Sequence, residues 1–168
     1  LVIGARQKRP EIGQVLRTVV AARGESSAWW RAATLEGLAQ GLGRRVEDSD
    51  GLDAAQKAHL LRLAEADEDG VRQASLGLLA VTGLPHGAQL TQSLSRAANI
   101  SATESEDPGR RADAIRLLTL AGPERWAADL KKLVTPSEPE PVQQAAAEAL
   151  GRIEGEETGK FFLSKWRA

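Results

Sequence analysis

The side chains with the widest chemical range in this chain are its two histidines, His59 and His86. His59 falls in a stretch of helical pattern, LDAAQKAHLLRLAEA, and His86 falls in the run LPHG. A zinc site needs several ligands at characteristic spacings, and no HExxH pair is present. The chain has no cysteine, so thiolate ligands, disulfides and a cysteine nucleophile are excluded. We therefore predict no metal site, and we assign neither histidine a catalytic role.

The run EGEETGKFF at residues 154–162 looks at first like a phosphate-binding loop. Such a loop needs GxxxxGK followed by serine or threonine, because backbone N–H groups wrap the phosphates and the hydroxyl holds magnesium. Here Gly155 and Gly159 stand one residue too close, and Phe161 replaces the hydroxyl. A Ser/His/Asp triad can be assembled from any order along a chain, but no GxSxG elbow is present. The sequence predicts no catalytic residues and no cofactor of its own.

The composition favours an all-α protein. The chain of 168 residues is 42% hydrophobic and 27% charged, with no tyrosine and two phenylalanines. Residues that favour helices dominate, whereas the aromatic and β-branched residues that favour strands are scarce. The length suits one domain of ordinary size.

The charge balance argues against binding to nucleic acid. With 22 basic and 23 acidic residues the net charge is −1, and the one basic cluster, RQKRP at 6–10, is short. Phosphate neutralisation usually requires a basic excess on one face. No apolar run approaches the roughly 20 residues that span a bilayer, so direct membrane insertion is not expected. Because the chain begins at Leu1 and stops within a helical pattern, we interpret it as a piece of a longer protein.

Four helical segments of one design recur along the chain. Each can be aligned on a core leucine, with a small residue four positions earlier and an apolar residue three positions earlier. The spacings of 41, 39 and 32 residues lie around the period of helical-pair repeats. The fourth segment carries an alanine-rich stripe over 142–153, which buries too little surface alone and needs neighbours on several sides. The aligned leucines are Leu38, Leu79, Leu118 and Leu150.

These segments resemble the second helix of HEAT-type repeats, in which an acidic or Asp-Pro start precedes Val-Arg and a small, apolar run. The best matches are DPGRR at 107–111 and DGVR at 69–72. In the fourth segment Gln143 replaces the arginine, whereas the first segment keeps it as Arg31. The resemblance covers nearly the whole chain. It implies an all-α, right-handed α-α superhelix, a HEAT-like solenoid of the armadillo type with about four helix pairs and the start of a fifth.

This organisation predicts a single array over residues 1–168 rather than separate domains. Polar runs at 44–51 and 99–109 are expected to be surface loops, and a domain boundary could also fall at the second of them. The helix pairs are expected at about 10–42, 52–83, 86–122 and 123–154, followed by a terminal helix at 158–167.

Three arginines, Arg31, Arg72 and Arg111, recur near corresponding positions of the segments. One interpretation makes them an inter-repeat ladder with acidic neighbours such as Asp69 and Asp107, each pair stabilising the stack modestly. The other makes them a partner-binding row on the concave face, where the HEAT resemblance places these helices. We favour the ladder, because recurring arginines of this kind more often belong to structural ion-pair networks than to binding sites.

Two adjacent tryptophans, Trp29 and Trp30, belong to the first segment. Neighbouring residues on a helix point about 100° apart, so both indoles can hardly face the same core. We expect one to be buried and the other to be at least partly exposed. An exposed tryptophan is a good anchor for a protein interface.

These features favour a non-catalytic helical-repeat scaffold, or a protein-interaction segment, of a larger protein. Its partner would be another protein or the neighbouring domains of the parent chain. The alternative is an enzyme on the same scaffold, since HEAT-like repeats also form a family of DNA glycosylases that grip DNA with a concave basic face. The near-zero net charge disfavours that alternative.

A more specific resemblance concerns the parent protein. The block RRADAIRLLTLAGPERWAADLKKLVTP, followed by PVQQAAAEALGRI and preceded by WWRAATLEGLAQGL, is similar to the helical spacer of bacterial membrane-bound dehydrogenase-like haem-binding proteins of planctomycete type. In that family a solenoid joins a β-propeller to a cytochrome c domain with a CxxCH haem motif. Because this chain has no cysteine, the resemblance implies that haem and catalysis belong to flanking domains, and that the protein is exported.

Overall fold

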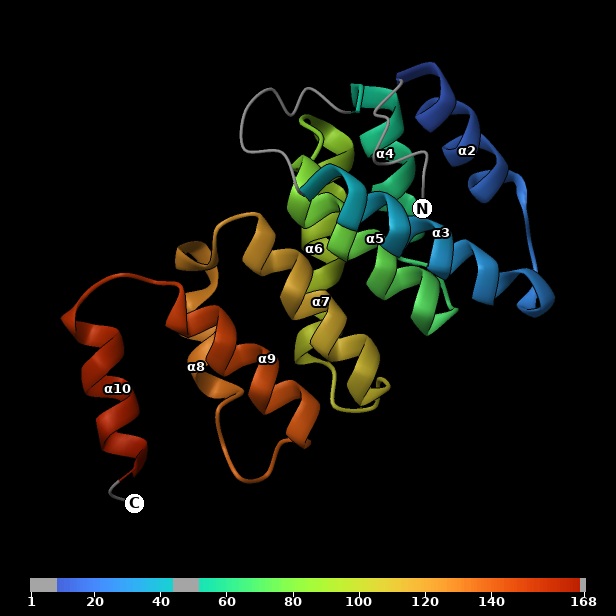
Figure 1. Ribbon diagram of the computed structural model, residues 1–168. Coiled ribbons are helices and arrows are strands. Elements are labelled where there is room, and N and C mark those ends of the chain that lie inside the picture. Colours follow the sequence, from blue (N-terminus) through green and yellow to red (C-terminus); the bar gives the residue numbers. More distant parts are fainter. Residues whose placement is uncertain (1–8, 44–51, 167–168) are drawn as a thin grey trace. The chain divides into compact units, whose positions relative to one another are not determined.

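The fold is all-α, as the composition predicts (Figure 1). The computed structural model describes residues 9–43 and 52–166, and the basic cluster at 6–8 and the run at 44–51 lie outside them. The described residues form nine α-helices and one 3₁₀ helix, η1. In chain order they are α2 (Arg9–Ala21), α3 (Glu25–Gly43), α4 (Ala54–Leu63), α5 (Asp69–Thr82), α6 (Ala88–Ala102), α7 (Pro108–Leu120), η1 (Pro123–Trp126), α8 (Ala127–Lys132), α9 (Glu140–Gly151) and α10 (Glu156–Trp166).

The chain divides into two compact units, Leu1–Ser93 and Leu94–Ala168, and the division falls within α6. In the first unit α3 packs along α5, and α4 packs against both α5 and α2 (Figure 1). The aligned leucines Leu38 and Leu79 are at most 1% exposed there. Packing in this unit therefore joins helices that are close in sequence order.

Local signals in the sequence set the ends of the helices in the first unit. Helix α4 begins at a capping box in which the Asp53 carboxylate accepts from the Gln56 backbone N–H at 2.8 Å, and the Gln56 side chain accepts from the Asp53 N–H at 3.0 Å. Helix α5 ends before Gly83, whose φ of 80° lies in the region that glycine adopts without a steric penalty. These caps mark where α4 begins and where α5 ends.

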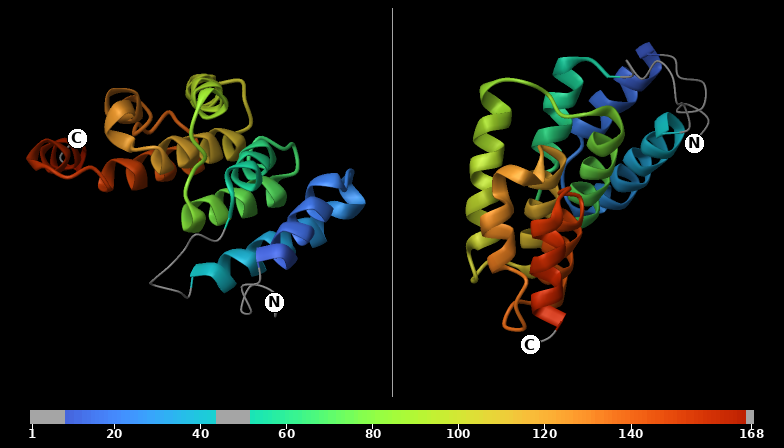
Figure 2. Two further views of the ribbon diagram at one scale, coloured as in Figure 1. Left: turned by 90° about the horizontal axis from the view of Figure 1, so that it is seen from above. Right: turned by 90° about the vertical axis from the view of Figure 1, so that its left-hand side faces the viewer.

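In the second unit α9 packs against both α7 and α8 (Figure 2). The alanine-rich stripe faces this core, which confirms the helical face predicted from its spacing. The alanines bring little bulk, so neighbouring helices approach α9 closely on more than one side. The stripe residues, all at most 2% exposed, are Val142, Ala145, Ala146, Ala149 and Leu150.

One stretch differs from the expectation in its local structure. The run at 99–109 was expected to be a loop, but α6 continues through Ala102. Polar side chains are compatible with that extension because they bond within the helix: the Ser101 hydroxyl donates to the Ala98 carbonyl at 2.9 Å. The stretch after Gly122 forms the 3₁₀ helix and then α8, which is only six residues long.

Among the residues that the structure describes, no helix combines the length and the apolar character needed to cross a membrane.

The close packing of α9 yields a stability prediction. Ala146 is fully buried, so Ala146→Leu should force neighbouring side chains apart and lower the free energy of unfolding by about 1–3 kcal/mol. The matched control is Ala128→Leu on α8, where the alanine is exposed and the change should stay within about 0.5 kcal/mol. Urea unfolding followed by circular dichroism measures both, and equal effects at the two positions would contradict this packing.

Candidate functional site

Arg31 is buried in α3 and joins three parts of the first unit. Only 2% of the residue is exposed. Its Nε donates to the backbone carbonyl of Val19, near the end of α2, at 3.1 Å. Its Nη1 donates to the Glu68 carboxylate, which directly precedes α5, at 3.0 Å. One side chain therefore fixes α3 relative to the helix before it and the helix after next.

Arg111 in α7 repeats this arrangement in the second unit. The residue is 1% exposed, and its Nε donates to the carbonyl of Ser101, near the end of α6, at 3.1 Å. Its two terminal nitrogens reach both oxygens of Glu138, in the turn before α9, at 2.7 and 3.0 Å. A two-pronged guanidinium–carboxylate pair of this kind is stronger and more directional than a single bond.

Arg72 is also buried, and it bonds to the turn that precedes its own helix. Its Nη1 donates to the carbonyls of Ala66 and Asp67 at 3.0 and 3.3 Å, and its Nη2 donates to Asp69 at 2.7 Å. Gln143, which replaces arginine in the fourth segment, donates to the Glu138 carbonyl at 2.6 Å. Each of the four aligned positions thus places a side-chain donor on a carbonyl that precedes its own helix.

The acidic partners are only partly those that the sequence suggested. Asp69 pairs with Arg72, but Asp107 caps α7 by accepting from the Arg110 backbone N–H at 2.9 Å. The carboxylates that connect one helix to another are Glu68 and Glu138. A signal for them exists in hindsight, since each stands four or five residues before the next aligned position, 72 or 143.

The two tryptophans differ in exposure. Trp29 on α3 is 74% exposed, whereas Trp30 is partly buried. Trp29 therefore presents a large amphipathic ring to solvent from a helix whose other face is buried. It is the most exposed of the large hydrophobic residues that the described part of the chain leaves at its surface.

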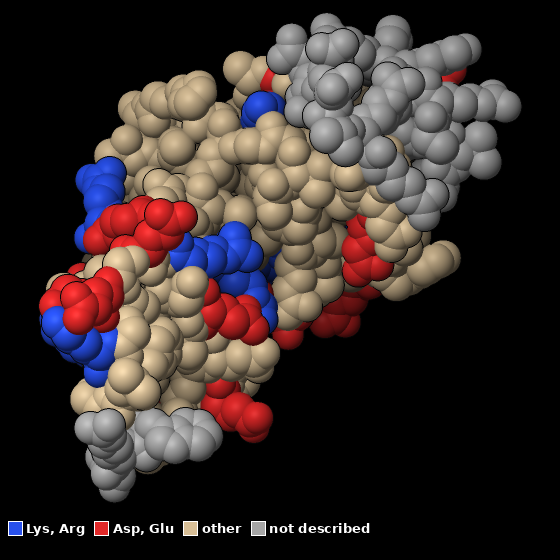
Figure 3. Space-filling view, turned by 60° about the vertical axis from the view of Figure 1, so that its left-hand side comes forward, with Lys and Arg blue, Asp and Glu red and all other residues tan. Residues whose placement is uncertain are grey.

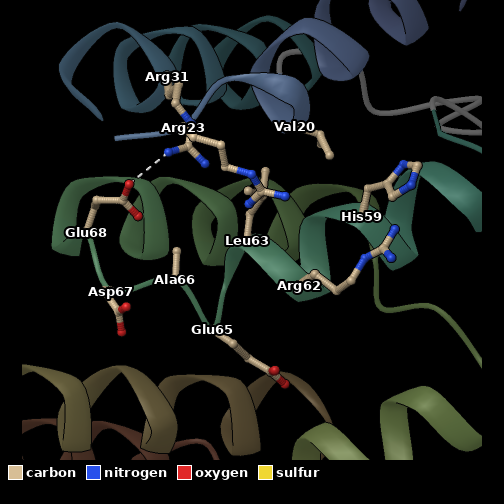
Figure 4. Close-up of a pocket in the computed structure, with 10 residues that line it drawn as sticks. All are labelled: Val20, Arg23, Arg31, His59, Arg62, Leu63, Glu65, Ala66, Asp67 and Glu68. Carbon is tan, nitrogen blue, oxygen red and sulfur yellow. Dashed lines mark hydrogen bonds and ion pairs between the residues drawn. The ribbon is translucent and has the colours of Figure 1, made fainter. Parts of the chain in front are cut away.

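A pocket of about 440 Å³ lies in the first unit, between the end of α2, the second half of α4 and the turn before α5 (Figure 4). Arg31 and Glu68 form one side of it. His59 and Arg62 come from α4, and Arg23 reaches in from the segment after α2. Sequence reasoning missed this site because three basic residues at irregular spacing make no motif.

Among the described residues, no group of three or more His, Cys, Asp or Glu side chains is placed to hold a metal ion. On the face shown in Figure 3, several basic side chains of the described residues lie beside acidic ones. The described residues also form exposed ion pairs, such as Lys132–Asp129 at 2.8 Å.

The chain was compared with protein-family models, curated proteins and solved structures, and none of them matches it.

The buried arginines yield a second stability prediction. Arg111→Met should lower the free energy of unfolding by about 3–5 kcal/mol, because Glu138, itself 13% exposed, loses the cation that pairs with it. The control is Lys132→Met, whose pair with Asp129 is 74% and 68% exposed and should contribute less than about 1 kcal/mol. Urea unfolding of each variant measures the difference.

A double variant checks the physical reason for that loss. Arg111→Met combined with Glu138→Leu leaves no unpaired charge in the turn, so it should recover much of the stability lost in the single variant. If the double variant is no more stable than Arg111→Met alone, the unpaired carboxylate is not the cause.

Proposed function

We propose that this chain is a non-catalytic, HEAT-like helical-repeat scaffold that serves as an interaction segment of a larger protein. The observation that carries the proposal is the arrangement shared by Arg31–Glu68 and Arg111–Glu138. In both units a buried arginine on one helix connects the carbonyl of the preceding helix to a glutamate before the helix after next. A stack of similar helix pairs would use one such connection at successive layers.

The sequential packing of the helices supports the same proposal. Helix α3 meets α5, and α7 meets α9, which is the contact order of a solenoid in which each pair touches its neighbours. The right-handed superhelix and the count of four helix pairs plus a fifth are part of this proposal. Its mechanism is the presentation of an extended surface to a protein partner or to neighbouring domains.

The contacts of the two buried arginines, Arg31 and Arg111, support a scaffold rather than an enzyme. The Arg31 and Arg111 side chains direct their hydrogen bonds to backbone carbonyls and to carboxylates of the fold itself. A catalytic group would instead direct its polar atoms toward a substrate. Trp29 is the best available anchor for a partner, because exposed tryptophans carry a large share of binding energy at interfaces.

The interaction role predicts a specific dependence on Trp29. The chain is immobilised, and the proteins retained from a lysate are quantified for the unsubstituted chain, Trp29→Ala and Leu163→Ala. Leu163 is the matched control, since it is 60% exposed on α10. We expect a set of proteins retained by the first and third samples and reduced at least about tenfold with Trp29→Ala, as for an interface anchor.

Circular dichroism melting first establishes that Trp29→Ala is folded, because an exposed position should change stability by no more than about 0.5 kcal/mol. Identical retention by all three samples would contradict a role for this surface in partner binding.

The identity of the parent protein is a separate part of the proposal and rests on the sequence resemblance alone. We propose the spacer of a haem-binding, dehydrogenase-like protein in which haem is attached in a flanking domain. A pyridine-haemochrome spectrum of the purified full-length parent should then show covalently attached c-type haem. A parent without haem would remove the dehydrogenase part of the proposal and leave the scaffold part standing.

A further inference from the structure

We propose that the pocket between α2, α4 and the turn before α5 binds the carboxylate side chains of an acidic peptide segment in the partner protein. This inference rests on the proposed interaction role and names the chemistry of the partner. Three observations carry it. The pocket contains basic side chains that no described acidic residue neutralises, and apolar side chains lie beside them. The positions of the second unit that match the two pocket arginines Arg23 and Arg62 are not basic.

The pocket contains basic groups that the described part of the chain does not neutralise. The side chains of Arg23, Arg62 and His59 make no hydrogen bond or ion pair with any described residue. Arg23 and Arg62 are exposed, so their guanidinium groups are accessible to a ligand. In Figure 4, Arg62 and His59 lie together at one end of the pocket, and Arg23 extends toward its middle.

The acidic residues around the pocket do not cancel these charges. Glu68 is paired with Arg31 at 3.0 Å, so its charge is already balanced. Glu65 and Asp67 each have polar partners of their own, and in Figure 4 both side chains point away from Arg23 and His59. The charge that remains for a ligand is therefore positive, and it selects an anionic group.

Apolar side chains complete a surface suited to an acidic amino acid. Val20 and Leu63 line the pocket beside the three basic groups. The methylene groups of a glutamate can pack on these side chains while its carboxylate reaches the guanidinium of Arg23 or Arg62. A volume of about 440 Å³ is within the range of ligand pockets and holds one or two side chains rather than a folded domain.

Guanidinium groups bind a carboxylate well, because their planar donors match its two oxygens, and they match a phosphate group in the same way. Nucleic acid is a poorer occupant, since its affinity depends on many phosphate contacts along a basic face. The chain has a net charge of −1. An acidic peptide needs only the local positive charge of the pocket.

The second unit repeats the framework without these basic groups. Counted back from the aligned positions, Arg23 stands eight residues before Arg31, and the residue eight before Arg111 is Thr103. Arg62 stands ten residues before Arg72, and the residue ten before Gln143 is a leucine. A structural requirement shared by the two units would be expected at both places. Arg23 and Arg62 are therefore not needed to hold helices together, which favours a binding role.

The first test uses the two histidines as built-in reporters. The imidazole signals of the full chain are followed by NMR during titration with a short oligoglutamate peptide with blocked ends, and with oligoglutamine as the neutral control. We expect a saturable shift of the His59 signal with oligoglutamate only. His86 lies outside the pocket and should not respond. Absence of a saturable His59 shift would overturn the proposal.

The second test compares substitutions that remove the same charge. Arg23→Gln and Arg62→Gln should each weaken oligoglutamate binding about tenfold, as expected for loss of a hydrogen bond to a charged group. Arg17→Gln is the control, because Arg17 is exposed on α2, outside the pocket, and has no partner among the described residues. Equal weakening by Arg17→Gln would mean that binding follows overall charge, which overturns the pocket assignment.

Two further probes separate carboxylate from phosphate chemistry. Inorganic phosphate and a short DNA duplex are titrated under the same conditions, and either one should bind more weakly than oligoglutamate. Tighter binding of either at the His59 signal would overturn the assignment to an acidic peptide. The scaffold proposal is judged independently: retention of partners that depends on Trp29, combined with no oligoglutamate binding, would reject the pocket while leaving the interaction role in place.

Discussion

The interaction on which the rest of the structure depends is the buried pair between an arginine and a glutamate of a following turn. Removing such charges from water costs several kcal/mol per ion, about as much as their attraction returns unless the remaining donors are also satisfied. Arg31 and Arg111 satisfy one further donor each, because each adds a bond from Nε to a backbone carbonyl. Lysine has a single ammonium group and could not reach a carbonyl and a carboxylate in different directions with the same fixed geometry.

This constraint acts together with the small side chains of the core. Arg111 can reach Glu138 only if α7 and the turn before α9 are close, and the alanine stripe of α9 permits that approach. Apolar burial supplies most of the stability, since it scales with the area removed from water. The arginine–glutamate pair then favours the relative placement of the helices in which the buried guanidinium keeps its carboxylate and carbonyl partners. Packing and ion pairing therefore specify the same arrangement within each unit.

Much of this fold is encoded locally, and the sequence predicts that part. The all-α class follows from composition, and the buried stripe of α9 follows from its helical spacing. The short α8 is harder to foresee, because the residues after Gly122 first form a 3₁₀ turn, Pro123–Trp126, and leave only six residues for the α-helix. The extension of α6 depends on polar residues that bond along the helix instead of forming a loop.

The site residues were harder to predict, because their contacts are distant in sequence. Arg31 and Glu68 are separated by 37 residues, and Arg111 and Glu138 by 27, so neither pair is visible as a local motif. The alignment of core leucines identifies the arginines but carries no information about which acid each one meets. The pocket is more difficult still, since Arg23, His59 and Arg62 are brought together only when α2 packs against α4.

Arg31 belongs to both the framework and the wall of the pocket, and this determines how the two roles can be separated. Its substitution would release Glu68, adding an unpaired negative charge beside Arg23 while also loosening α3 from α5. Stability and anion binding would then fall together, whichever role was the cause. Arg23 and Arg62 carry the pocket's charge without taking part in the buried pairs, so a loss of binding there can be assigned to the pocket alone. The fold thus uses one arginine to hold the wall in place and leaves two others available to a partner.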